Sequence, residues 1–119
     1  MSHGRSEVSF KNDYGHRIYV AYMRRDFGCQ AECGEPWENR GWIRLDPGET
    51  EYRANPTENQ WFYYYAEAVN GAIWTGPYIV EAVNTKFSSC SCLGHTGAWY
   101  TVGMRELDTV KWAGVRFIP

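Results

Sequence analysis

A run of five consecutive aromatic side chains, from Trp61 to Tyr65, constrains the fold of this chain more than any other feature. Side chains along a strand point alternately to opposite faces of a sheet. A strand over residues 60–69 therefore carries aromatic side chains on both faces. A strand that is covered on both faces usually lies inside a sheet and not at its edge. We therefore expect residues 60–69 to form a central strand.

Further short strands are predicted where β-branched and aromatic residues alternate with turn residues. The best turn signals are Asp46-Pro47-Gly48-Glu49 and Asn70-Gly71, the second being typical of a two-residue hairpin. Residues 24–39 show no clear period and are expected to form a long loop, and residues 81–87 form at most a turn or two of helix. The other strands are expected at residues 8–11, 17–23, 41–45, 50–53, 72–74, 77–80, 99–102 and 110–117.

Short strands at this spacing predict an all-β fold, a small antiparallel β-sandwich or barrel of about seven to nine strands. The chain has 119 residues, which suits one domain over residues 1–119, with residues 1–6 as a flexible tail. Hydrophobic residues make up 44% of the chain, so it can close a core and disorder is not expected.

Charge and hydropathy argue against two classes of partner. The net charge is −2, and the nearest approach to a basic cluster is the pair Arg24–Arg25, so nucleic-acid binding is not expected. No apolar run approaches the roughly 18 residues that span a membrane. The first six residues lack the apolar stretch of a signal peptide. We expect a cytoplasmic protein, or a secreted one if a leader has been removed.

Seven short motifs occur in a recognisable order along the chain. They are Asn12, Val20-Ala21, Gly41-Trp42, Pro47-Gly48-Glu49, Tyr65-Ala66-Glu67, Trp74-Thr75-Gly76, and Phe87 with Cys90. This ordered set, over roughly residues 8–107, resembles a bacterial family known as domain of unknown function ten thirty-six. The family usually has cysteines where this chain has Lys11 and Thr50. The resemblance implies a compact bacterial β domain and no established activity.

The four cysteines form two close pairs, Cys29 with Cys33 and Cys90 with Cys92, and three alternatives stay open. Crossed disulfides between the early and the late pair would close a loop of about 60 residues and stabilise the fold by about 4 kcal/mol. Four thiolates could instead hold one structural zinc ion, with His95 able to replace one of them. Free thiols that only fill space are the third alternative. Redox catalysis is not expected, because no Cys-x-x-Cys opens a helix.

No set of residues predicts an active site, so we expect a protein that is not an enzyme. Cys92 and His95 could form a nucleophile and base, but no third group orients them. Glu67 lies on the aromatic strand, and a buried carboxylate there needs a partner. A structural ion pair is the expected answer, and the candidate partners are Arg17, Arg44 and Arg53.

The aromatic residues suggest a binding surface. The six tryptophans cannot all lie at the centre of so small a core, and we expect Trp37, in the long loop, to be partly exposed. The leading hypothesis is a non-catalytic domain that binds a partner protein or a small ligand near residues 27–39. A carbohydrate-binding or cell-surface-binding module is the first alternative, and a small metal-dependent protein built on the cysteines is the second. The predicted binding residues are Trp37, Trp42, Tyr65 and Trp74.

Overall fold

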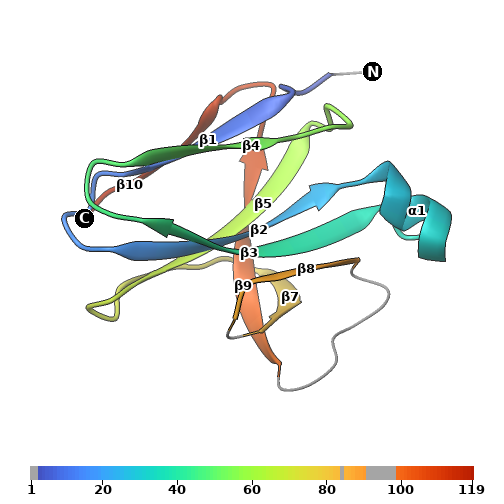
Figure 1. Cartoon of the computed structure of the whole chain (residues 1–119). Coiled ribbons are helices and arrows are strands. Elements are labelled where there is room, and N and C mark those ends of the chain that lie inside the picture. Colours follow the sequence, from blue (N-terminus) through green and yellow to red (C-terminus); the bar gives the residue numbers. More distant parts are fainter. Residues whose placement is uncertain (1–2, 84, 91–98) are drawn as a thin grey trace.

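The computed structural model describes residues 3–83, 85–90 and 99–119, which form two β-sheets (Figure 1). This confirms the all-β prediction, with ten strands in the described residues in place of seven to nine. In chain order the elements are β1 (Glu7–Asn12), β2 (Ile18–Arg25), α1 (Phe27–Cys33), β3 (Trp37–Leu45), β4 (Thr50–Ala54), β5 (Trp61–Ala68), β6 (Ile73–Trp74), β7 (Tyr78–Ala82), β8 (Phe87–Cys90), β9 (Tyr100–Asp108) and β10 (Gly114–Phe117).

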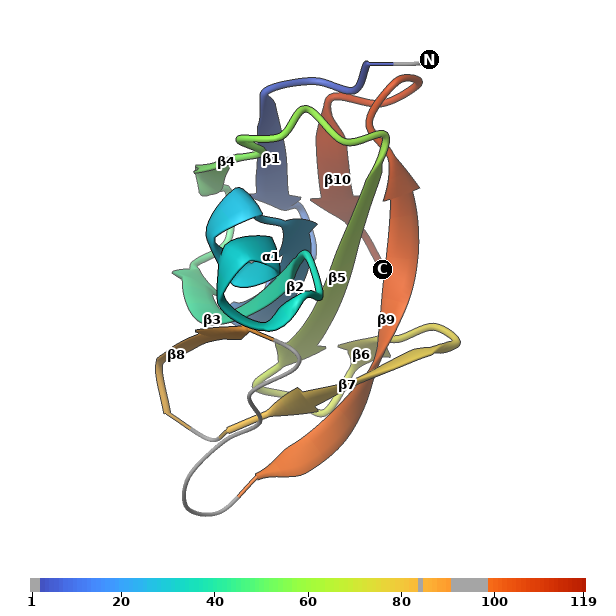
Figure 2. The ribbon, with the colours of Figure 1, turned by 90° about the vertical axis from the view of Figure 1, so that its right-hand side faces the viewer.

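The larger sheet has seven strands in the order β7-β9-β5-β2-β3-β8, with β6 paired to β5, and its neighbouring strands run antiparallel to one another. The sheet is curled, and β7 contacts β3 although the two are not neighbours in the sheet (Figure 2). β5 lies inside the sheet, as the aromatic run predicts. Asn70 and Gly71 lie in the turn between β5 and β6, which confirms a hairpin at this place. The backbone N–H of Ala68 donates to the carbonyl of Ala72, so the loop holds Val69, Asn70 and Gly71 instead of the predicted two residues.

The smaller sheet has the order β10-β1-β4, and one of its pairs is parallel. β1 runs antiparallel to β4 but parallel to β10, which corrects the expectation of a fully antiparallel fold. The backbone N–H of Ser9 donates to the carbonyl of Ala113 at 3.1 Å, just before β10 begins. This bond places the start of β10 beside β1, and the two strands then run in the same direction.

One core cluster lies between the two sheets. Phe10 of β1 is fully buried and packs against four aromatic rings, with centroid distances of 6.1 to 6.3 Å. Those rings belong to Tyr22, Phe62, Tyr64 and Phe117. The apolar side chains of β1, β2, β5 and β10 thus join the two sheets into one unit.

A second core cluster lies on the opposite face of the larger sheet. It contains Tyr63 and Tyr65 of β5, whereas Phe62 and Tyr64 belong to the first cluster. β5 therefore carries buried aromatic side chains on both faces, as its sequence predicts. The other buried members of the second cluster are Ala21, Ala82, Val102 and Met104.

Residues 24–39 do not form a long loop, and this prediction is wrong. β2 continues to Arg25, α1 follows, and β3 begins at Trp37. The Asp26 side chain caps α1 by accepting a hydrogen bond from the backbone N–H of Cys29 at 3.0 Å. Gly34 ends the helix in the left-handed conformation, with a φ of 84°.

Three other segments differ from expectation. Residues 110–113 are not strand, since β10 begins at Gly114, and residues 81–82 belong to β7 instead of a helical turn. Residues 4–6 are not a free tail, because Gly4 donates to the Glu58 carbonyl and the Ser6 carbonyl accepts from Asn55. In the described part of the chain, no helix has the length and apolar character needed to cross a membrane.

Candidate binding pocket

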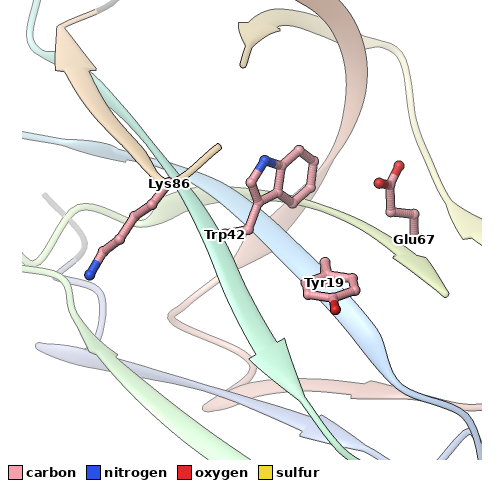
Figure 3. Close-up of a pocket in the computed structure, with 4 residues that line it drawn as sticks. All are labelled: Tyr19, Trp42, Glu67 and Lys86. Carbon is pink, nitrogen blue, oxygen red and sulfur yellow. The ribbon is translucent and has the colours of Figure 1, made fainter. Parts of the chain in front are cut away.

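An open pocket of about 400 Å³ lies on the face of the larger sheet that carries the second core cluster. Its described lining consists of Tyr19 of β2, Trp42 of β3, Glu67 of β5, and Lys86, which immediately precedes β8 (Figure 3). Tyr19 and Glu67 are register partners across the β2–β5 pair. Side chains opposite each other in an antiparallel pair share a face, so these two face the pocket together.

The Trp42 indole is held in place from several sides. Its Nε1–H donates to the backbone carbonyl of Val83 at 2.8 Å. Its ring makes edge contacts with the rings of Tyr65 and Phe87, with centroid distances of 6.0 and 6.2 Å. A Cβ on the preceding Gly41 would collide with the Phe87 ring, so glycine leaves the space that this ring occupies. The aromatic wall of the pocket is thus fixed before any ligand arrives.

Glu67 supplies the negative charge of the pocket. The Tyr65 hydroxyl donates to its Oε2 at 3.0 Å. Burial raises the pKa of Tyr65, and the neighbouring carboxylate raises it further. Burial also raises the pKa of Tyr100, and the charge of the Glu67 carboxylate raises it further.

The structural ion pair expected for Glu67 is not formed among the described residues, and this prediction is wrong. The three candidate arginines bind other carboxylates: Arg17 and Arg44 bind Asp46 at 2.7 and 3.3 Å, and Arg53 binds Glu51 at 3.2 Å. The reason is register, since the Asp46–Glu49 turn and β4 bring closer acids to these guanidinium groups. Among the described residues, the hydrogen-bond donor to Glu67 is the Tyr65 hydroxyl.

The predicted binding residues fall into different places. Trp42 lines the pocket, and Tyr65 packs against it from the second core cluster. Trp37 belongs to β3 instead of a loop, and its half-buried ring packs edge-on against Tyr63 at 5.5 Å. Trp74 packs against the other cluster, with its ring 5.4 Å from that of Phe117. The structure therefore brings Trp42 and Tyr65 together, and it places Trp74 elsewhere.

Tyr19 and Lys86 line the pocket but were not predicted as site residues. For Tyr19 a partial signal exists in the sequence, because alternation along residues 17–23 puts Tyr19 and Ala21 on one face. What the sequence lacks is the β2–β5 register, which alone places Tyr19 opposite Glu67. Lys86 precedes a strand, and no sequence pattern marks it.

For Cys29 and Cys90 the structure agrees with the first of the three cysteine alternatives, a disulfide between the early and the late pair. These two form a disulfide between α1 and β8, with a sequence separation of 61 residues. Cys33 is disulfide-bonded as well, and Cys92 and His95 lie outside the described residues. Thiolates are the zinc ligands, so the predicted four-cysteine zinc site applies only to the reduced chain.

One cluster of metal-type side chains is present among the described residues, and each member is already engaged. Donor atoms of Asp26, Cys29 and Glu38 lie within 4.8 Å of one another. Asp26 caps α1, Cys29 is in the disulfide, and Glu38 accepts from Arg24 and Arg40 at 3.1 and 2.8 Å. The cluster is explained by these structural contacts.

A second hollow, the tryptophan groove, lies where β9 ends and β10 begins. Its volume is about 530 Å³, and Trp61 and Trp112 line it with 37% and 63% of their surfaces exposed. The charged side chains that line it carry both signs: Glu106, Asp108, Lys111 and Arg116. It is more open than the first pocket, and neither tryptophan belongs to a core cluster.

The fold and the first pocket together define a small all-β domain with a preformed aromatic pocket. Comparison of the chain with protein-family models, with curated proteins and with solved structures finds no match. The resemblance to domain of unknown function ten thirty-six stays a prediction. Two of the motifs that carry it meet in the pocket, because Trp42 belongs to Gly41-Trp42 and Glu67 ends Tyr65-Ala66-Glu67.

Proposed function

We propose that this chain is a non-catalytic binding domain that holds a small polar ligand in the pocket formed by Tyr19, Trp42, Glu67 and Lys86. The observation that carries the proposal is the fixed Trp42 indole beside charged side chains in one cavity. Small-molecule sites are typically concave, partly aromatic, and within a range of about 300 to 1,000 Å³. The pocket, at about 400 Å³, has these properties.

The chemistry of the lining supports binding over catalysis. The described lining contains one carboxylate, one ammonium and two aromatic side chains, with no histidine, cysteine or serine among them. Covalent catalysis needs an activated nucleophile next to a base, and glycoside hydrolysis needs a pair of carboxylates. A single carboxylate beside an indole is better suited to recognising a ligand.

The test follows the Trp42 indole N–H in ¹H–¹⁵N NMR spectra while small polar compounds are added. A ligand of the pocket should shift this resonance. Trp42→Leu, followed through the backbone amide resonance of Glu67 because the indole is gone, should weaken its binding at least five-fold. Trp112→Ala is the matched control, because it removes an exposed tryptophan from the tryptophan groove and should leave binding intact. If compounds shift the Trp112 resonance and leave that of Trp42 in place, the proposed site is wrong.

Carbohydrate binding is a second candidate, which the tryptophan groove favours. Exposed indole faces stack on sugar rings, and side chains of both signs can accept from and donate to hydroxyl groups. A glycan array tests it, with Trp112→Ala expected to abolish a positive signal and Trp42→Leu expected to preserve it. An array with no signal at millimolar saccharide removes this candidate.

The Cys29–Cys90 disulfide bears on the compartment. Disulfides form and persist where the environment is oxidising and are rare in a reducing cytoplasm. The disulfide thus supports the secreted alternative. A cytoplasmic location stays a prediction, and it requires these two cysteines to be reduced in the cell.

A further inference from the structure

We propose that the pocket recognises an organic ammonium group, with the Glu67 carboxylate as its counter-ion and the rings of Trp42 and Tyr19 as its walls. This inference rests on the proposed function, because it names the chemical class of the ligand for the same pocket. It is carried by the charge of the lining and by the positions of the nearby cations.

Glu67 is a carboxylate without a cationic partner among the described residues. Its side chain is partly buried in a pocket lined by aromatic rings, and it makes no ion pair among the described residues. The Tyr65 hydroxyl that donates a hydrogen bond to Glu67 is uncharged, so it does not neutralise the carboxylate. A carboxylate that is removed from water gains most from a cationic partner. The described residues do not supply that partner, so a ligand can.

Lys86 and Arg17 are two cationic side chains near the pocket, and neither is paired with Glu67. Lys86 lines it on the far side of Trp42, and in Figure 3 its ammonium group points away from Glu67. Arg17 lies against Tyr19, but its Nε donates to the Asp46 carboxylate at 2.7 Å. Neither side chain forms an ion pair with Glu67, so the carboxylate remains available to a cationic ligand.

The aromatic walls of the pocket, Trp42 and Tyr19, also favour a cation. The face of an aromatic ring attracts a cation through its quadrupole, and tryptophan is the most effective ring for this interaction. Trp42 and Tyr19 both line the pocket, and Tyr19 lies directly opposite Glu67 in the sheet. Rings and a carboxylate together favour a cation that is large and weakly hydrated. An anion would be repelled by Glu67, and an uncharged ligand of the same shape would gain hydrophobic contact with the rings but no attraction to the carboxylate.

The experiment compares three probes of the same shape in the wild-type protein. Choline is the cation, 3,3-dimethylbutan-1-ol is its uncharged isostere, and 3,3-dimethylbutanoate is the anion. Binding is followed through the Trp42 indole N–H resonance. We expect choline to bind at least ten-fold more tightly than the uncharged isostere, and the anion to bind more weakly than both. This comparison needs no variant and cannot be confused with a folding defect.

Variants then assign the preference to residues. Glu67→Gln preserves the shape of the side chain and an oxygen that can accept from Tyr65, and it should bring the choline-to-isostere ratio close to one. Trp42→Leu removes the indole reporter, so its binding is followed through the backbone amide resonance of Glu67, and it should weaken choline at least five-fold. Lys86→Gln, which removes a positive charge from the rim, should leave choline binding unchanged or strengthen it. Asp108→Asn, in the tryptophan groove, is the matched control for loss of a carboxylate and should have no effect.

The outcomes separate the two proposals. If the uncharged isostere or a neutral saccharide shifts Trp42 as strongly as choline does, and Glu67→Gln changes neither, the ammonium inference is overturned while the binding function stands. If no compound of any charge shifts Trp42 at millimolar concentration, both proposals fail. A ten-fold preference that Glu67→Gln removes supports both.

Discussion

The Tyr65 hydroxyl lies 3.0 Å from a carboxylate oxygen of Glu67, two residues further along β5. Residues two apart on a strand share a face, so the bond joins the second core cluster to the pocket. Tyr65 also packs against Trp42, and one side chain therefore supports both the carboxylate and the indole of the site. Substitutions at Tyr65 are expected to change the pocket as well as the core.

The buried tyrosines predict a loss of stability at high pH. Burial raises the pKa of Tyr63 to about 12, helped by Glu106, and it raises the pKa of Tyr65 as well. The folded pKa then exceeds the unfolded value of about 10. This stabilisation is fully present below pH 10 and is lost as the pH rises through about 12. The free energy of unfolding should fall by at most about 1.4 kcal/mol per pH unit for each tyrosine.

Urea denaturation at pH 8 to 12 measures this slope, and absorbance at 295 nm measures tyrosine ionisation. Tyr65→Phe should reduce the slope above pH 10, because it removes one of the shifted groups. Tyr52→Phe is the control, since Tyr52 is 58% exposed and should leave the slope as it is. An equal slope in wild type and Tyr65→Phe would contradict the assignment.

Breaking the Cys29–Cys90 disulfide should cost at most about 4 kcal/mol of unfolding free energy, because Cys33 is also disulfide-bonded and that second cross-link still constrains the unfolded chain. The bond closes a loop with a sequence separation of 61 residues, and a constraint of that length removes chain entropy from the unfolded state. Peptide mapping without reductant should recover one peptide that links the two cysteines. Chemical denaturation of Cys29→Ser/Cys90→Ser then gives the difference in stability, and a peptide map without the linked peptide would show that the bond does not form.

Phe10 is predicted to be the most costly core position in the smaller sheet. It is fully buried among four aromatic rings, so Phe10→Ala would leave a cavity between the sheets. The expected loss is about 3 to 5 kcal/mol. Phe27→Ala is the matched control, because Phe27 is 67% exposed and should change stability by no more than about 0.5 kcal/mol. Equal losses at the two positions would refute the assigned core.

Gly41 is predicted to tolerate no side chain while Phe87 is present. A Cβ on Gly41 would overlap the Phe87 ring, so Gly41→Ala should cost about 1 to 3 kcal/mol. The double variant Gly41→Ala/Phe87→Ala should lose less than the sum of the two single variants, since it relieves the overlap. Additive losses, measured by urea denaturation, would mean that the two residues do not interact.

Local sequence signals predicted much of the framework. The aromatic run over Trp61–Tyr65 indicated a central strand with two covered faces, and Asn70-Gly71 indicated the hairpin that follows it. Both signals depend on neighbours in the chain, through alternation and turn conformation. They hold without knowledge of any distant contact.

The errors arise from distant contacts and from weak local signals. α1 was missed because seven residues have little periodicity, although its caps, Asp26 and Gly34, were visible in the sequence. The parallel β1–β10 pair joins residues more than 100 positions apart, and no local pattern encodes it. The pocket depends on the β2–β5 register in the same way, so Trp42 could be predicted while its neighbours Tyr19 and Lys86 could not.

The link between α1 and β8 makes the chain from Cys29 to Cys90 a closed covalent ring that contains β3 to β7 in full. A protease that cuts the exposed Asp46–Glu49 turn would open this ring without releasing a fragment. The nicked molecule would keep its mass apart from one added water, and it would come apart only when reduced and unfolded. The part of the chain that carries Trp42 and Glu67 therefore stays covalently connected after a single cut, because the disulfide still joins its two ends.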